Sequence, residues 1–102
     1  MSIEYTGTLS PPLVKHQITE LLDHVAALDG WVVVRRTDQT LGLGLQKSDN
    51  DAEASELVSI SLTADQVYVG FHAGHRHHRE SVLQAVIDHL TTSGATCHLE
   101  EL

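Results

Sequence analysis

Hydrophobic residues recur at helical spacing in two segments of the chain. In residues 11–28 they follow one another every three or four positions, and residues 77–92 repeat the pattern. Because this spacing places side chains on one face of a helix, each segment is predicted to be an amphipathic helix. Ser10 is expected to cap the first helix, with proline in its first turn. Gly30 and Gly94 are expected to end the two helices.

The remaining hydrophobic segments have patterns that are typical of β-strands. They are residues 3–9, 31–36, 41–45, 58–62, 66–71 and 95–99. The link between 58–62 and 66–71 is so short that these two segments are expected to form a hairpin. In 41–45 leucine alternates with glycine, and the glycine face leaves room for a close neighbour. The segment 3–9 is interpreted as a first strand that could lie at a sheet edge, and 31–36, a short apolar run rich in β-branched residues, as an interior strand.

The predicted order is strand, helix, four strands, helix, strand. Each helix has one apolar stripe to bury, so the economical packing places both helices on one face of a mostly antiparallel sheet. We therefore predict an α+β fold, a two-layer sandwich. A chain of 102 residues is expected to form a single domain, residues 1–102.

The chain is acidic, with a net charge of −8 from fourteen acidic and six basic residues. This balance argues against nucleic acid as a ligand, because phosphate binding needs clustered lysine and arginine. It is compatible with a basic protein partner, or with solubility alone. No apolar run reaches the about 18 residues of a membrane span, and no signal peptide is apparent. Together with the single Cys97, this makes the cytoplasm the expected location.

Residues 47–56 have no hydrophobic periodicity and are interpreted as an exposed loop. The acidic residues of the loop are Asp49, Asp51, Glu53 and Glu56. Such a loop could simply be solvated, or it could attract a basic partner. Its pattern does not match that of an EF-hand, which needs glycine and glutamate at fixed positions.

Four of the eight histidines lie within seven residues, between the end of the predicted strand 66–71 and the first turn of the second predicted helix. The titratable and basic residues of this histidine cluster are His72, His75, Arg76, His77, His78 and Arg79. One interpretation is structural: neutral histidines suit the first turn of a helix better than lysines would, because the helix dipole disfavours cations there.

Two functional interpretations of the histidine cluster stay open. The spacing of His72, His75 and His77 could hold a zinc ion, although the rest of a metal site is not evident. Alternatively, the cluster is a positive spot that binds an anionic ligand or an acidic patch, more tightly below about pH 6.5, where histidine becomes charged. A metal-binding or pH-sensing module that also includes His78 is therefore an alternative function.

The sequence gives little support for catalysis. Cys97 and His98 are adjacent, but neighbouring side chains of a strand point to opposite faces and do not form a dyad. Ser59 and Ser61 lie on the expected outer face of a strand without a motif around them. His16, Glu20 and His24 would line one solvent face of the first helix, a span too long for one metal ion. The chain is therefore expected not to be an enzyme.

In size, charge and element order the chain resembles small bacterial immunity proteins, which neutralise toxins by masking their active sites. The segments 68–72, 79–80 and 99–102 are similar to pieces of such domains. The resemblance implies a protein-binding role and assigns no functional residue. The leading hypothesis is thus a non-enzymatic protein-binding domain, with the acidic loop and the histidine cluster as contacts. A homodimer joined through a strand such as residues 3–9 is a further alternative.

Overall fold

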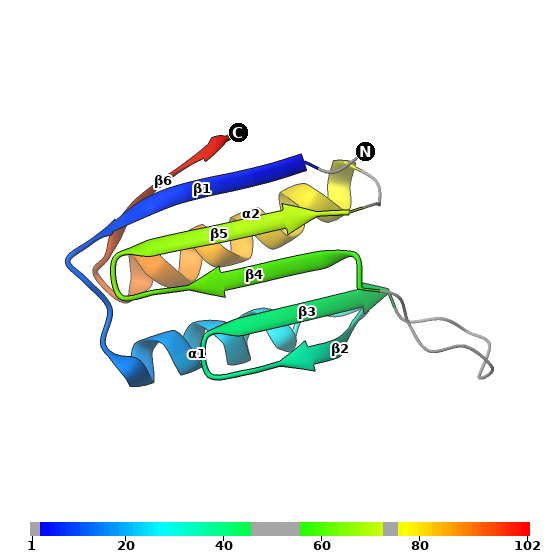
Figure 1. Ribbon diagram of the computed structural model, residues 1–102, viewed down its shortest axis with the longest axis horizontal. Helices are drawn as coiled ribbons and strands as arrows, with labels where there is room; N and C mark the ends of the chain where they lie inside the picture. Colours follow the sequence, from blue (N-terminus) through cyan, green and yellow to red (C-terminus); the bar gives the residue numbers. More distant parts are fainter. Residues whose placement is uncertain (1–2, 46–55, 73–75) are drawn as a thin grey trace.

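The computed structural model describes residues 3–45, 56–72 and 76–102 and shows one antiparallel sheet covered by two helices (Figure 1). This is the predicted α+β sandwich. The elements follow the predicted order: β1 (Ile3–Ser10), α1 (Lys15–Ala26), β2 (Trp31–Arg36), β3 (Thr40–Leu45), β4 (Val58–Leu62), β5 (Gln66–Phe71), α2 (Arg76–Thr92) and β6 (Thr96–Glu101). Neither helix of these described residues has the length and apolar character needed to cross a bilayer.

The sheet has the strand order β2-β3-β4-β5-β1-β6, and each neighbouring pair is antiparallel. β4 and β5 form the predicted hairpin, with Leu62 opposite Val67. β1 pairs with β5 on one side and with β6 on the other. The expectation that residues 3–9 lie at an edge is therefore wrong, and so is a dimer through that strand. In the described sheet the outer strands are β2 and β6, so the expectation that 31–36 is an interior strand is also wrong.

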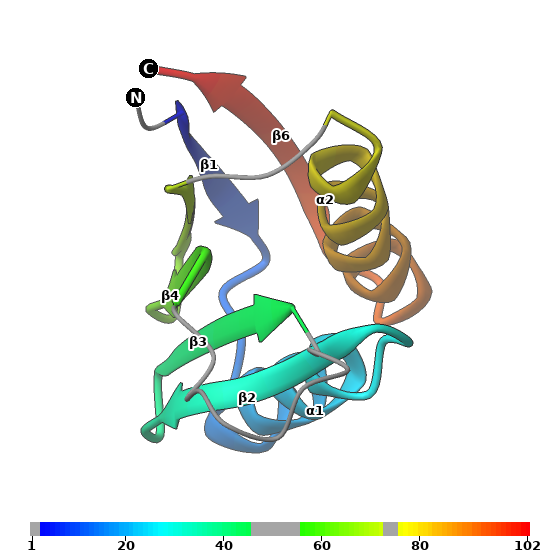
Figure 2. The same cartoon turned by 90° about the vertical axis from the view of Figure 1, so that its right-hand side faces the viewer.

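Both helices lie on the same face of the sheet, as predicted (Figure 2). Alternation places the apolar residues of each strand on that face: Val58, Ile60 and Leu62 of β4 are buried, while Ser59 and Ser61 are only partly covered. The helices contribute apolar stripes, and no polar side chain is buried among the described residues. The core therefore lies between one sheet face and the helices, and none of the described elements covers the opposite sheet face.

The start of α1 differs from the prediction. Ser10 is the last residue of β1, where it pairs with Thr96, so it cannot cap a helix. The helix begins at Lys15, and the side chain of Gln17 accepts a hydrogen bond from the Val14 N–H at 2.9 Å. The residues between strand and helix are held against the β4–β5 turn, since the Leu13 N–H bonds the Ala64 carbonyl. The sequence could not show this, because the contact is remote along the chain.

Glycine follows the end of each helix as predicted. Gly30 and Gly94 both have φ of 86°, in the left-handed region that other residues rarely adopt. Each allows the chain to leave its helix and turn back into the sheet. The paired register of β2 and β3 shifts between Val33 and Arg35, which is a β-bulge on an outer strand.

Candidate binding face of the sheet

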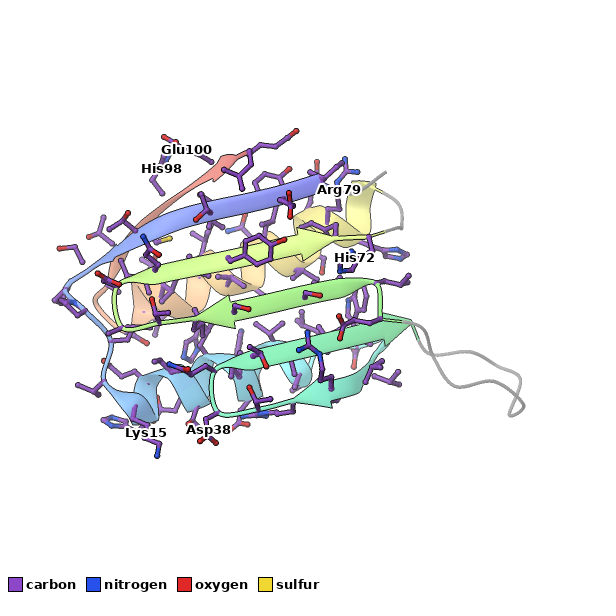
Figure 3. All side chains as sticks on the ribbon, in the orientation of Figure 1. Lys15, Asp38, His72, Arg79, His98 and Glu100 are labelled. Carbon is purple, nitrogen blue, oxygen red and sulfur yellow. The ribbon has the colours of Figure 1, made fainter. Side chains whose placement is uncertain are left out.

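The face of the sheet without helices, here called the open face, is polar. Alternation along the strands places on it the residues that lie between the buried ones. The side chains of this face include Glu4, Thr6, Thr8, Arg35, Ser59, Ser61, Gln66, Tyr68, His98 and Glu100. Figure 3 shows His72 near one end of the face and His98 with Glu100 near the other. Hydroxyl, imidazole and carboxylate groups are therefore presented together on a surface built from all the strands.

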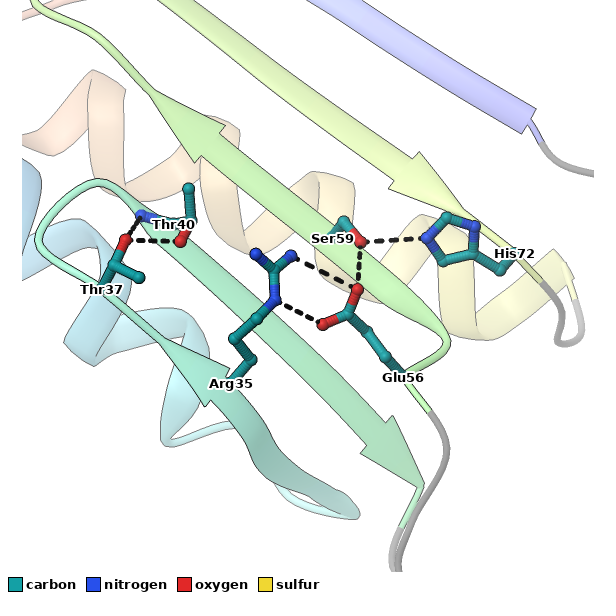
Figure 4. Close-up of polar contacts among 6 residues, drawn as sticks. All are labelled: Arg35, Thr37, Thr40, Glu56, Ser59 and His72. Atoms are coloured by element: carbon teal, nitrogen blue, oxygen red, sulfur yellow. Dashed lines mark hydrogen bonds and ion pairs between the residues drawn. The ribbon is translucent and has the colours of Figure 1, made fainter.

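Four side chains form a connected polar network at the ends of β2, β4 and β5 (Figure 4). Arg35 donates two hydrogen bonds to Glu56, from Nε to Oε1 at 2.9 Å and from Nη2 to Oε2 at 3.3 Å. Ser59 donates its hydroxyl to Glu56 Oε2 at 2.8 Å, and His72 Nε2 lies 2.9 Å from the same hydroxyl oxygen. The network joins residues that are up to 37 positions apart in sequence, from 35 to 72.

Gly42 provides the space in which the Glu56 carboxylate lies. A Cβ atom at residue 42 would be 1.9 Å from Glu56 Oε1 and 2.7 Å from its carboxyl carbon. β3 separates β2 from β4, so the carboxylate must pass across β3 to reach Arg35. The prediction that the glycine face of this strand accepts a close neighbour is confirmed at Gly42, and the neighbour is a carboxylate.

The hydrogen-bond directions within the network determine what Ser59 can do. An ionised carboxylate only accepts hydrogen bonds, so the Ser59 hydroxyl is committed to Glu56. His72 Nε2 must then carry a hydrogen and donate it to the Ser59 oxygen. A nucleophilic serine needs the reverse arrangement, in which the imidazole accepts the hydroxyl proton. The geometry therefore fits a structural or binding role of these side chains, and it does not activate Ser59.

The network shifts the acidity of its charged members. The hydrogen bonds from Arg35 and then Ser59 lower the pKa of Glu56 below its usual 4.5, and burial opposes this only in part. The hydrogen bond between Arg35 and Glu56 also raises the pKa of Arg35. The pair is therefore ionised over the whole neutral range, and the guanidinium charge of Arg35 is compensated locally.

A second group of polar side chains lies toward β6. The Tyr68 hydroxyl donates to Glu4, and its ring leans over Gly70, where a Cβ would be 2.7 Å from the hydroxyl oxygen. Farther along, a shallow hollow of about 330 Å³ has polar walls. The residues that line it are Thr6, Gly7, Thr8, Gln66, His98 and Glu100. These side chains can donate to or accept from a ligand, but no cation lies among them unless His98 is protonated.

Of the acidic residues of the predicted loop, Glu56 is the one that the structure describes, and it belongs to this site. Asp49, Asp51 and Glu53 lie outside the described residues. The loop's role as a contact therefore stays a prediction for those three. Glu56 itself is only partly exposed and is bonded within the chain, so its charge is shared with Arg35.

The histidine cluster is divided by the fold. His72 joins the network on the open face, while the ring of His78 packs edge-on against Trp31, with centroids 5.7 Å apart. Arg79 is half-buried in the first turns of α2. His75 lies outside the described residues, as do the side chains of Arg76 and His77, whose backbone begins α2. His72 and His78 therefore point to different surroundings and do not form one patch.

A zinc site at His72, His75 and His77 stays a prediction, since two of these side chains are not described. Within the described ranges, no three histidine, cysteine or acidic side chains converge as metal ligands would. Cys97 packs against the core, and burial raises the pKa of its thiol, while His98 is exposed on the open face. The two side chains lie on opposite faces of β6, as the strand pattern predicted.

Two contacts were missed in the sequence, one at the site and one between the two helices. In the sequence Arg35 is one residue of a predicted strand, and the pattern of hydrophobic and polar residues does not indicate that it pairs with Glu56. His24 was placed on the solvent face of the first helix together with Glu20, but its ring also lies 4.9 Å from that of His89 on α2. Contacts of this kind depend on which elements become neighbours, and spacing along the chain does not specify that.

No family model matches the chain, and no curated protein or solved structure is significantly similar to it. Function therefore has to rest on the chemistry of the open face itself.

Proposed function

We propose that the chain is a non-enzymatic protein-binding domain, whose open face binds a basic partner protein. The observation that carries this proposal is the charge of that face. Among its described side chains, Glu4, Glu56 and Glu100 are acidic, and Arg35, the one guanidinium, is already bonded to Glu56. The remaining side chains are mostly hydroxyls and amides, which make adaptable hydrogen bonds.

The shape of the face supports a macromolecular partner. The open face extends over the whole sheet, and its one described hollow is shallow and polar. Small-molecule sites are usually deep and mostly apolar, which this hollow is not. A partner with lysine and arginine side chains would find the carboxylates of Glu4, bonded to the Tyr68 hydroxyl, and of Glu100, which lies 3.7 Å from the imidazole of His98.

Charge complementarity gives the proposal a kinetic consequence. An acidic protein attracts a basic partner over a distance of about 8–10 Å at ordinary salt, so association should be fast and salt-dependent. An immunity-type inhibitor of a basic toxin is the class of protein that fits best. The cytoplasm stays the expected location, and we propose no nucleic-acid or membrane ligand.

The experiment begins with capture of a basic protein from the organism that encodes the chain. The captured protein is purified, and its association rate is measured against Glu4→Gln/Glu100→Gln at several salt concentrations. We expect the double variant to bind more slowly and with a flatter salt dependence. The matched control is Asp29→Asn/Asp38→Asn, which removes the same two charges from loops outside the open face.

The control decides how the result is interpreted. If both double variants slow association equally, only net charge matters and the open face is not the binding surface. If neither variant changes the rate, the acidic residues play no part, and the proposal fails. Chemical-shift changes confined to β1, β5 and β6 on addition of the partner would locate the contact independently.

A further inference from the structure

Within the described part of the chain, the outer edge of β2 has no partner strand and carries two exposed valines. β2 is one of two outer strands of the described sheet, so half of its backbone N–H and C=O groups have no partner strand. Val33 and Val34 are 47% and 40% exposed, and they are two of the four large hydrophobic side chains that are exposed among the described residues. An edge of this kind is a template for another strand.

The charges on β2 do not oppose such pairing. Arg35 is bonded to Glu56 on the open face, and Arg36 Nη1 lies 2.6 Å from Asp23 Oδ1 of α1 on the helix face. Each arginine is thus compensated within its own chain, and two copies of β2 can approach without net repulsion. β6 is different, because Glu100 and Glu101 stand at its end, and the nearest cationic candidate is His98, 3.7 Å from Glu100.

The bulge gives β2 a symmetry that a regular strand lacks. In a regular strand, residues 31 and 36 would point to opposite faces, since faces alternate. Here Trp31 contacts His78 of α2, and Arg36 contacts Asp23 of α1, so both lie on the helix face. Their inner neighbours, Val32 by alternation and Arg35 by its bond to Glu56, both lie on the open face. Positions 31, 32, 35 and 36 therefore present the same succession of faces from either end of the strand.

We propose that two copies of this chain dimerise by antiparallel pairing of their β2 strands. In the two-fold register Trp31 lies opposite Arg36 of the second copy, and Val32 lies opposite its Arg35. Val33 and Val34 meet at the centre, where both lose their exposure. In this register Trp31 and Arg36 share the helix face, and Val32 and Arg35 share the open face, as antiparallel pairing requires. Trp31 and Arg36 can also make a cation–π contact, which strengthens the ends of the pairing.

Such a dimer has a continuous sheet with all four helices on one side. Both open faces then lie on the other side and form a single larger surface. The dimer does not depend on the proposed partner binding, because it needs only the chain itself. A pairing of six residues buries less than the about 1,200–2,000 Å² of a stable interface, so we expect reversible, concentration-dependent association.

Sedimentation of the purified full chain across a range of concentrations tests the proposal. The mass should rise from 11.2 kDa to twice that value and no further. Val34→Lys should hold the chain at the monomer mass at every concentration, because it places a charge at the centre of the interface. Val14→Lys is the matched control: Val14 is 52% exposed just before α1 and is not part of β2, and its variant should dimerise normally.

Amide hydrogen exchange on the unaltered chain provides a second measurement that needs no variant. Exchange at β2 should slow as concentration rises, while exchange at β6 should not change. A monomer at all concentrations, or a Val34→Lys dimer, would overturn the proposal. So would masses that grow beyond the dimer with protection at both strands, because this would mean head-to-tail pairing of β2 with β6.

Discussion

The two faces of the sheet are built on different principles. The helix-covered face consists of aliphatic side chains such as Leu41 and Ile60, which are fully buried and opposite one another in the register. The open face consists of polar groups that bond across strands, as Arg35 does with Glu56. Burial of apolar area stabilises the first face whatever the pH, whereas the second depends on charge and on small residues that make room. Stability is therefore concentrated on the covered face, and the open face is the one that we propose to bind a partner.

The largest expected effect comes from the covered face. Leu41→Ala removes a side chain that is 0% exposed and leaves a cavity, so the free energy of unfolding should fall by about 2–5 kcal/mol. Urea unfolding followed by circular dichroism measures this. The matched control is Ser61→Ala on the open face of the neighbouring strand, which should change the unfolding free energy by less than about 0.5 kcal/mol. Equal losses at both positions would contradict the division between the faces.

A smaller effect is expected at Gly42, where the open face depends on a missing side chain. Gly42→Ala should expel the Glu56 carboxylate, since the new Cβ would overlap it, and should raise the pKa of Glu56 toward 4.5. The lowered pKa of Glu56 stabilises the fold above about pH 4.5, and this contribution is lost as pH falls through the lowered value. Gly42→Ala should therefore reduce the free energy of unfolding at neutral pH. The further decrease of this free energy on acidification should be smaller than in the unaltered chain.

A double-mutant cycle separates this effect from strain in β3. In a Glu56→Ala background, Gly42→Ala should cost less stability than it does in the unaltered chain, because no carboxylate remains to be displaced. NMR titration of the Glu56 side chain gives the pKa directly. Additive losses in the cycle would show that Gly42 is required by the strand itself, and would remove its role in the network.

The covered face was predictable from the sequence, and the open face only in fragments. The alternation in 58–62 and the spacing in 11–28 specify which side chains are buried, because both patterns are local. Glycine in 41–45 indicated a close neighbour, but only the strand order shows that Glu56 fills the space. Strand order also explains why residues 3–9 are not at an edge: pairing with β5 and β6 joins segments that are distant along the chain. Local pattern carries no information about such pairings.

The contact between α1 and α2 provides a pH-dependent test of the covered side. Burial lowers the pKa of His89 below 6.5, the ring of His24 lowers it further, and Glu20 partly opposes both. His89 therefore binds a proton less readily in the folded chain than in the unfolded chain. Its contribution is fully present above about pH 6.5 and is lost as pH falls from there through the lowered value. We expect the unfolding free energy to decrease over this window.

His24→Gln should move the pKa of His89 back toward 6.5 and make that decrease smaller, which NMR titration and urea unfolding at several pH values can measure. His16→Gln is the control, because His16 lies exposed on the same helix without a ring contact to His89 among those described. An unchanged His89 pKa in the His24 variant would show that burial alone causes the shift.

The smallest expected effect is at Tyr68, on the acidic part of the open face. The hydrogen bond to Glu4 raises the pKa of the Tyr68 hydroxyl above 10, with burial and the Glu4 charge adding to it. Glu4→Gln keeps an acceptor oxygen and removes the charge, so the pKa of Tyr68 should fall while the fold stays intact. Ultraviolet titration measures the pKa of Tyr68 when the titration curve of a Tyr68→Phe variant is subtracted. Tyr5, the other tyrosine, contributes equally to the two curves. Because Glu4 is one of the carboxylates proposed to bind a basic partner, saturation with that partner should also lower the pKa of Tyr68. A partner that binds without altering this titration would have to contact another part of the chain.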